Sequence, residues 1–415
     1  MTSQPGASLS RRLGTGDAVV VGLGSMIGAG VFAAIGPAAA AAGGGLLIGL
    51  AIAAFVAYCN ATSTAQLAAV YPRSGGAYLY GRERLGELWG YLAGWGFVIG
   101  KTASCAAMAL TFGAYAWPGA ARPLALAAIV AVVAVNYHGI HRTAAATRAI
   151  VVVVLAALAA AVAAALLGGQ ASVDRLDLGD SAGPYGILQA AGLLFFAFAG
   201  YARIATLGEE VRDPERTIPR AIPLALGIAL AVYAAVAVAA LLALGPDRLA
   251  TSTAPLADAA RAGSLDWLAP AVRVGAAVAS LGVLLSLLAG VSRTTLAMAR
   301  DRELPGVLDA VHPRHRVPHR AELAIGAIVA AAVLAVDLRD AIGFSSFAVL
   351  AYYAIANASA LTLAPHERRW PRWPAAAGLA GCAALAITLP PAAAATGAGV
   401  LLLGVAVRAT RAGRP

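Results

Sequence analysis

Residues 21–32 read VGLGSMIGAGVF, and four of these twelve residues are glycine. The stretch lies inside an apolar segment, 16–40, that is long enough to cross a membrane as a helix. Glycine in a helix interior costs roughly 1 kcal/mol relative to alanine. A hydrophobic helix with Gly22, Gly24, Gly28 and Gly30 near its centre is therefore weakened where an ordinary spanning helix would be regular.

The composition is that of an integral membrane protein. Of 415 residues, 60% are hydrophobic and 12% are charged, and the mean hydropathy is +0.78. Soluble domains carry about a quarter charged residues. The polar, basic first 16 residues lack the apolar core and cleavage site of a signal peptide, so we expect no removable leader.

Apolar runs of membrane-spanning length recur along the whole chain. They predict an all-α integral membrane protein with about 12 transmembrane helices, at 16–40, 45–69, 88–117, 123–137, 147–168, 186–207, 221–245, 267–298, 321–337, 341–363, 373–389 and 391–407.

The arginines between these runs predict the orientation. With the N-terminus inside, 22 arginines fall in inner segments and 6 in outer segments. Cytoplasmic loops carry the excess of basic residues, so the tails 1–15 and 408–415 are both expected in the cytoplasm and the chain in the cell membrane. This bias also accounts for the net charge of +10 without a nucleic-acid partner.

Three explanations of the glycine stretch were weighed. A dinucleotide-binding loop needs a preceding strand and an acidic residue about 20 positions later, and no Asp or Glu occurs between Asp17 and Glu83. Close helix packing through the GxxxG of Gly24 and Gly28 remains open. The alternative is a broken helix of the kind that binds substrate in transporters. A second glycine interruption, at Gly200 five helices later, favours the broken helix.

Three stretches resemble the amino acid–polyamine–organocation (APC) permeases. They are GSMIGAGVF (24–32), FFAFAGY (195–201) followed by EEVRDPERTIPRAI (209–222), and ARDRELP (299–305). The resemblance implies a LeuT-type fold with broken helices 1 and 6. Its ten-helix core, 16–363, would consist of two inverted five-helix repeats, helices 1–5 (about 16–168) and 6–10 (about 186–363). Two peripheral helices, 373–407, would follow.

The resemblance also implies a substrate site. Backbone N–H groups of the helix 1 break would bind an α-carboxylate, and carbonyls of both broken helices would hold the α-amino group. The matching residues here are Ser25, Met26, Ile27, Gly28, Ala29 and Gly30 in helix 1, with Phe196, Ala197, Phe198, Ala199 and Gly200 in helix 6. An aromatic residue at the Phe196 position commonly acts as a lid. Because three phenylalanines cannot all face one cavity, we expect Phe196 and Phe198, rather than Phe195, to do so.

The chain departs from the family at positions that often take part in proton coupling. Many relatives carry an acid after the helix 6 aromatic residue, but Tyr201 is followed here by Ala202. Others use a lysine on helix 5, and 149–169 contains no ionisable residue. The only lysine in the sequence, Lys101, lies 12 residues after Trp89 and 16 before Trp117, which places it near mid-membrane.

An ionisable residue at this depth is a candidate functional residue. We therefore assign Lys101 as the proton-coupling residue, the alternative being a lysine satisfied by neighbouring carbonyls. Sodium coupling through helix 8 hydroxyls such as Ser286 is the less favoured rival. Arg203 is expected to pair with Glu209 or Glu210 in a gating or structural role.

Together these features predict a secondary active amino acid transporter that works by alternating access, with proton-coupled uptake of a neutral amino acid. A neutral substrate is expected because no carboxylate lies in a span interior. The alternative is a cationic amino acid or polyamine exchanger of the same fold. A membrane-embedded enzyme or a channel is disfavoured, because no span holds an Asp, Glu or His constellation. No cofactor or metal is expected, and the loop histidines 312, 315 and 319 are not expected to bind a metal ion. The oligomeric state stays open.

Overall fold

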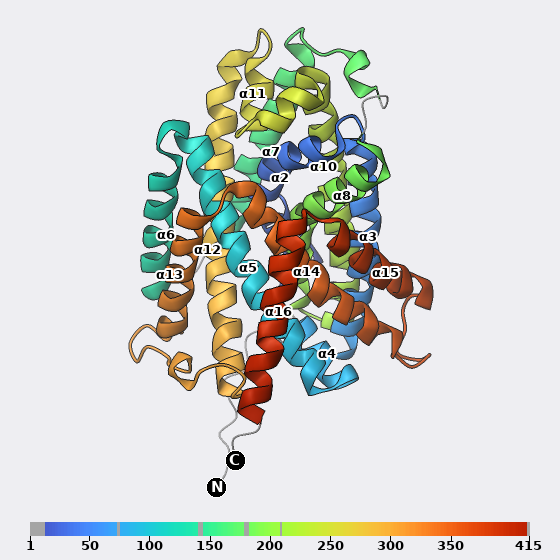
Figure 1. Cartoon of the computed structure of the whole chain (residues 1–415), viewed down its shortest axis with the longest axis vertical. Coiled ribbons are helices and arrows are strands. Elements are labelled where there is room, and N and C mark those ends of the chain that lie inside the picture. Colours follow the sequence, from blue (N-terminus) through green and yellow to red (C-terminus); the bar gives the residue numbers. More distant parts are fainter. Residues whose placement is uncertain (1–12, 73–74, 140–143, 178–181, 208–209, 413–415) are drawn as a thin grey trace.

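A computed structural model describes residues 13–72, 75–139, 144–177, 182–207 and 210–412 of the chain (Figure 1). These residues are nearly all helical and contain no strand, only one isolated bridge between Leu13 and Val211. The helices are α1 (Thr15–Met26), α2 (Ala29–Ala42), α3 (Leu46–Val70), α4 (Ala77–Leu85), α5 (Glu87–Ala116), α6 (Ala121–Tyr137), α7 (Ala144–Leu167), α8 (Gly183–Phe198), α9 (Ala202–Ala205), α10 (Pro214–Thr251), α11 (Pro255–Arg261), α12 (Ala269–Arg300), α13 (His319–Ala335), α14 (Leu338–Leu361), α15 (Arg372–Thr388) and α16 (Pro391–Ala412).

Each predicted span coincides with a helix or a pair of helices. The first span is α1 plus α2, and the sixth is α8 plus α9 joined by a 3₁₀ turn, η3 (Ala199–Tyr201). The seventh span was expected to end at residue 245, where Gly245 takes a φ of 73° and interrupts α10. The short helices α4 and α11 had not been expected.

Nine helices in the described part of the chain are long and apolar enough to cross a membrane, or ten if the bent pair α1–α2 counts as one span. The two remaining predicted spans, α13 and α15, have 17 residues each. At 1.5 Å per residue they reach about 25 Å, short of the roughly 30 Å hydrocarbon core. The membrane-spanning all-α fold is thus confirmed, whereas the count of twelve stays a prediction.

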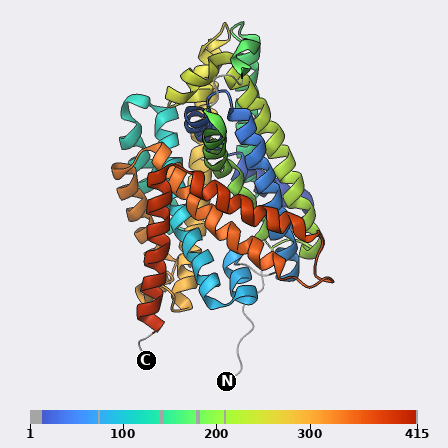
Figure 2. The same cartoon turned by 45° about the vertical axis from the view of Figure 1, so that its right-hand side comes forward.

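Helices from the first half of the chain pack against their counterparts from the second half. The contacts pair α2 with α8, α3 with α10, α5 with α12, and α6 with α13, which are the first to fourth and sixth to ninth spans. Two inverted repeats would produce this pairing, although the repeat itself remains a prediction. The last two helices lie outside the pairing: α15 packs on α14 and α3, and α16 on α14 (Figure 2).

Polar contacts join predicted inner segments to each other and outer segments to each other. On the inner side, Arg408 at the end of α16 donates to Glu87 and Glu303, each at 3.2 Å. On the outer side, Arg175 donates to the carbonyl of Leu242 at 2.9 Å. The bundle therefore has two distinct polar ends, as a membrane protein requires. α4 and the end of α16 lie at one end and α11 at the other (Figure 1).

Candidate functional site

The first span is interrupted between Met26 and Ala29, inside the glycine stretch. Ile27 has φ −78° and ψ 57°, and Gly28 has φ −113° and ψ −147°, so neither is helical. The two pieces are bent by 45°. Because α2 starts here, its first-turn N–H groups have no carbonyl one helical turn before them and can bind a ligand anion.

The sixth span is interrupted less than expected. Instead of a break, the backbone tightens into the 3₁₀ turn Ala199–Tyr201 and continues into α9. Ala199 has φ −63° and ψ −2°, close to helical values. The break expected in helix 6 is thus a tighter turn in the structure, since a single glycine permits such a turn without ending the helix.

The two interruptions touch each other through their backbones. A Cβ atom at Gly200 would lie 2.2 Å from the carbonyl oxygen of Ser25, and one at Gly30 would lie 2.7 Å from Cα of Ala197. Neither distance leaves room for a side chain, so glycine is required at both positions. The structure thus brings together the two segments in which the sequence placed the site. We call their contact the crossing, defined by residues 25–30 and 197–200.

Carbonyl oxygens at the crossing accept hydrogen bonds from buried tyrosines. The Tyr233 hydroxyl, on α10, is 2.5 Å from the carbonyl oxygen of Met26 and 2.9 Å from that of Ala197. It therefore bridges the two interrupted spans. The Tyr353 hydroxyl, on α14, donates to the carbonyl of Ala199 at 3.2 Å. Neither tyrosine was expected from the sequence, since both lie in ordinary apolar helices.

Lys101 lies next to the same carbonyls. Its side chain, on α5, is 6% exposed. Its Nζ is 3.5 Å from the carbonyl oxygen of Ala199. Among the described residues it makes no ion pair. Burial disfavours the charged form of an amine, and carbonyl oxygens only partly replace the lost water.

Side chains around the crossing are apolar or aromatic. Val283 of α12 faces Gly28, where an added Cβ would lie 2.2 Å from a Val283 methyl. Phe198 packs edge-to-face on Tyr233 with ring centroids 5.0 Å apart. Phe195, which had not been expected to face the site, packs edge-to-face on Tyr353 at 5.9 Å. Phe196 is buried as well.

Three further candidates do not join the crossing. The Arg203 guanidinium donates to Thr206 Oγ1 at 2.9 Å, and Glu210 lies within electrostatic range of it. Glu209 lies outside the described residues, so its expected pairing is untested. Ser286 is exposed, and its hydroxyl donates to the Gly282 carbonyl of its own helix.

One buried carboxyl group was not expected from the sequence. Glu322, at the start of α13 and at one end of the predicted span 321–337, is 2% exposed. It accepts a hydrogen bond of 2.9 Å from Asn136 Nδ2 on α6. In the sequence Glu322 follows His319 and Arg320, which reads as the end of a polar loop.

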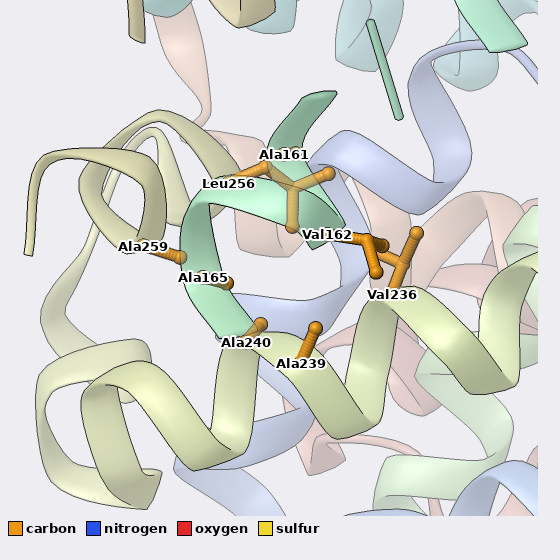
Figure 3. A pocket seen from close by; sticks show the side chains of 8 residues that line it. All are labelled: Ala161, Val162, Ala165, Val236, Ala239, Ala240, Leu256 and Ala259. Atoms are coloured by element: carbon orange, nitrogen blue, oxygen red, sulfur yellow. The ribbon is translucent and has the colours of Figure 1, made fainter. Parts of the chain in front are cut away.

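Hollows elsewhere in the molecule do not compete with the crossing. One is lined only by apolar side chains of α7, α10 and α11 (Figure 3): Ala161, Val162, Ala165, Val236, Ala239, Ala240, Leu256 and Ala259. Another, of about 360 Å³, lies beside 366–369, at the polar end that contains α4. Within the described ranges, no three His, Cys, Asp or Glu side chains are grouped to hold a metal ion.

The fold and the crossing define a multi-pass membrane transporter with an interrupted first span. The profile of the family described as "Amino acid permease" matches residues 17–384, and the chain belongs to this family. It is 66% identical over 403 residues to an uncharacterised transporter of Mycobacterium tuberculosis (strain H37Rv), which covers 97% of this chain and 92% of the relative.

More distant relatives have more specific names. A branched-chain amino acid permease of Bacillus subtilis is 27% identical over 389 residues, 88% of this chain and 83% of the relative. Cationic amino acid transporter 4 of Homo sapiens is 29% identical over 382 residues, 86% of this chain and 60% of the relative. These names concern those proteins.

Proposed function

We propose that the protein is a secondary active transporter that takes up a neutral amino acid by alternating access, coupled to protons. The observation that carries the proposal is the crossing, where two interrupted spans meet backbone to backbone and are surrounded by buried polar donors. Irregular backbone at membrane depth is tolerated where it lines a substrate cavity.

The crossing offers complementary groups to the two ends of an amino acid. First-turn N–H groups of α2 suit the α-carboxylate, because a helix N-terminus carries partial positive charge. Carbonyl oxygens of Met26, Ala197 and Ala199 suit the α-ammonium group. These carbonyls now accept from Tyr233, Tyr353 and Lys101, so a bound ammonium would share or replace these donors.

A neutral side chain fits the surroundings best. Apolar and aromatic groups such as Val283 and Phe198 border the crossing, and the charged side chain hydrogen-bonded there is Lys101. A cationic substrate would meet a like charge in a medium of low dielectric constant. The branched-chain permease among the relatives supports this substrate class, whereas the human relative keeps the cationic alternative open, since aromatic faces can bind cations.

Lys101 is the proposed proton carrier. When charged it holds the Ala199 carbonyl more strongly than when neutral, so its protonation state would bias the sixth span between two conformations. A proton can drive a conformational change only through such a difference in affinity between two states. We also propose that both termini lie in the cytoplasm and the protein in the cell membrane, which the arginine bias favours.

Uptake into proteoliposomes tests the proposal. Labelled alanine should accumulate when the proton gradient is directed into the vesicles, and this accumulation should not depend on sodium. Neutral amino acids should compete with alanine better than arginine or lysine does. Lys101→Ala should lose gradient-driven accumulation while substrate exchange persists. Sodium-driven uptake, or a Lys101→Ala protein that still concentrates alanine on a pH gradient, would contradict the coupling. Competition by arginine or lysine alone would support the cationic exchanger.

A further inference from the structure

A second buried ionisable group lies outside the crossing. Glu322 is 2% exposed at the start of α13, where α13 packs on α5, α6 and α12. In the described part of the chain its carboxyl group makes no ion pair. A carboxylate buried without a cation costs several kcal/mol, so the group is expected to be protonated or to change its protonation during function.

The polar neighbours of Glu322 can hold either form of its carboxyl group. Asn136 Nδ2 donates to Oε1 at 2.9 Å, which favours the carboxylate, whereas burial favours the neutral acid. Ser292 of α12 lies within hydrogen-bond reach of the carboxyl, and its hydroxyl oxygen is 2.9 Å from the Leu288 carbonyl oxygen. The Ser292 hydroxyl can donate to a carboxylate, or it can donate to Leu288 and accept from the protonated acid, so the site suits a group that exchanges a proton.

The Glu322 cluster is linked to the crossing through two helices. On α5, the buried Cys105 thiol is one turn from Lys101 and within electrostatic range of both Lys101 and Glu322. On α12, the Leu285 carbonyl accepts from Asn136 at 3.3 Å, two residues from Val283, which faces Gly28. A change at Glu322 thus alters the hydrogen bonding of Asn136, which connects α6 to α12, the helix that contacts the first interruption.

We propose that Glu322 is a second proton-exchanging residue of the transport cycle, on the inner side of Lys101; this rests on the proposed proton coupling. The Lys101 ammonium gives up its proton and becomes the amine. The Glu322 carboxylate takes up that proton and becomes the acid, and the acid then releases it to cytoplasmic water. The Lys101 amine then takes a new proton from the outer side and becomes the ammonium again, so one proton crosses per cycle and both residues return to their starting states.

The other charged or titratable groups near Glu322 come from each helix that packs on it. α13 itself contributes His319 and Arg320, and α12 contributes Arg293, which acts on the carboxyl electrostatically. α5 contributes Cys105. Beyond Asn136, the end of α6 is followed by His138. Each of these neighbours will affect the pH at which Glu322 releases its proton, so the test removes only the carboxyl.

Glu322→Gln removes ionisation and preserves the shape of the side chain. In proteoliposomes we expect it to lose accumulation on a pH gradient, down to the level reached without a gradient. Exchange of internal for external substrate should stay within about twofold of wild type. Glu215→Gln, which changes an exposed acid, is the control and should accumulate like wild type.

A measurement on wild-type protein makes the test independent of folding in the variant. Substrate addition should produce an infrared difference band of a protonated carboxylic acid, and Glu322→Asp, which still ionises, should shift it. If a proton gradient drives uptake equally well in the wild type and in Glu322→Gln, this inference is overturned and the proposed proton coupling stands. The absence of the band in the wild type would do the same. A wild type indifferent to the pH gradient would overturn the proposed coupling as well.

Discussion

The two interruptions that form the crossing differ in depth. The first span loses helical geometry at Ile27 and Gly28 and bends by 45°. The sixth span keeps near-helical dihedrals and only tightens into a 3₁₀ turn at Ala199–Tyr201. Their chemical contributions differ accordingly. The first offers N–H donors at the new helix start together with the Met26 carbonyl, whereas the sixth offers only carbonyl acceptors. The substrate carboxylate would therefore be bound by the first span alone and the ammonium group by both spans.

The contact between the spans should be broken most completely at Gly200. In Gly200→Ala the methyl would lie 2.2 Å from a backbone oxygen, that of Ser25, which cannot rotate away. We expect uptake to be abolished. Gly290→Ala is the matched control, because a Cβ there meets nothing within 4 Å and alanine favours the helix. Equal uptake in the two variants, at equal expression, would show that the crossing is not essential.

Gly28, in the first interruption, should tolerate change better, since its neighbour is a side chain. In Gly28→Ala the methyl would lie 2.2 Å from a methyl of Val283. We expect a large loss of uptake that is partly restored by adding Val283→Ala, which vacates that space. Failure of the double variant to regain activity would indicate that Gly28 is required for its backbone conformation and not for its packing against α12.

Tyr233 and Tyr353 donate to different carbonyls of the crossing, so substituting each one tests a different contact. Tyr233→Phe removes the hydroxyl whose single hydrogen is shared between the carbonyls of Met26 and Ala197, and a lost hydrogen bond costs about 1 kcal/mol. We expect uptake to fall about tenfold. Tyr353→Phe should cost less, because the Ala199 carbonyl keeps Lys101 as a donor. The order is checked by measuring KM and maximal rate for both variants, and the reverse order would place the key contact on the sixth span alone.

The smallest effect is expected from the loop histidines at the inner end. Burial, followed by the neighbouring His312, lowers the pKa of His315 and His319 below the usual 6.5. The folded loop therefore prefers their neutral forms. Its stability is intact above pH 6.5 and declines as the pH falls from 6.5 through the lowered values.

Hydrogen exchange of this loop at descending pH measures that decline. If the crossing and Glu322 set the pH dependence of uptake, the double variant His315→Asn/His319→Asn should leave it nearly unchanged. A pH profile abolished in the double variant would move proton sensing from the membrane interior to the loop.

The sequence predicted the spans well because hydrocarbon thickness dictates long apolar runs, and it located the crossing because only glycine permits it. The sequence did not predict features that depend on contacts between residues far apart in the chain. Tyr233 and Tyr353 are unremarkable within apolar helices, and their partners come from other spans. Glu322 follows polar loop residues and is buried only because α6 and α12 cover it. The 3₁₀ turn at Ala199 was missed because one glycine is compatible with either a break or a tighter turn.

The backbone contact between Gly200 and Ser25 has a mechanical consequence. Two helices whose backbones touch with no side chain between them cannot come closer together. If they slid along each other, their flanking side chains would clash. Rotation about the point of contact remains available. The crossing is therefore suited to serve as a fulcrum, at which the bound molecule stays nearly still while the distant halves of the two spans swing through the largest distances.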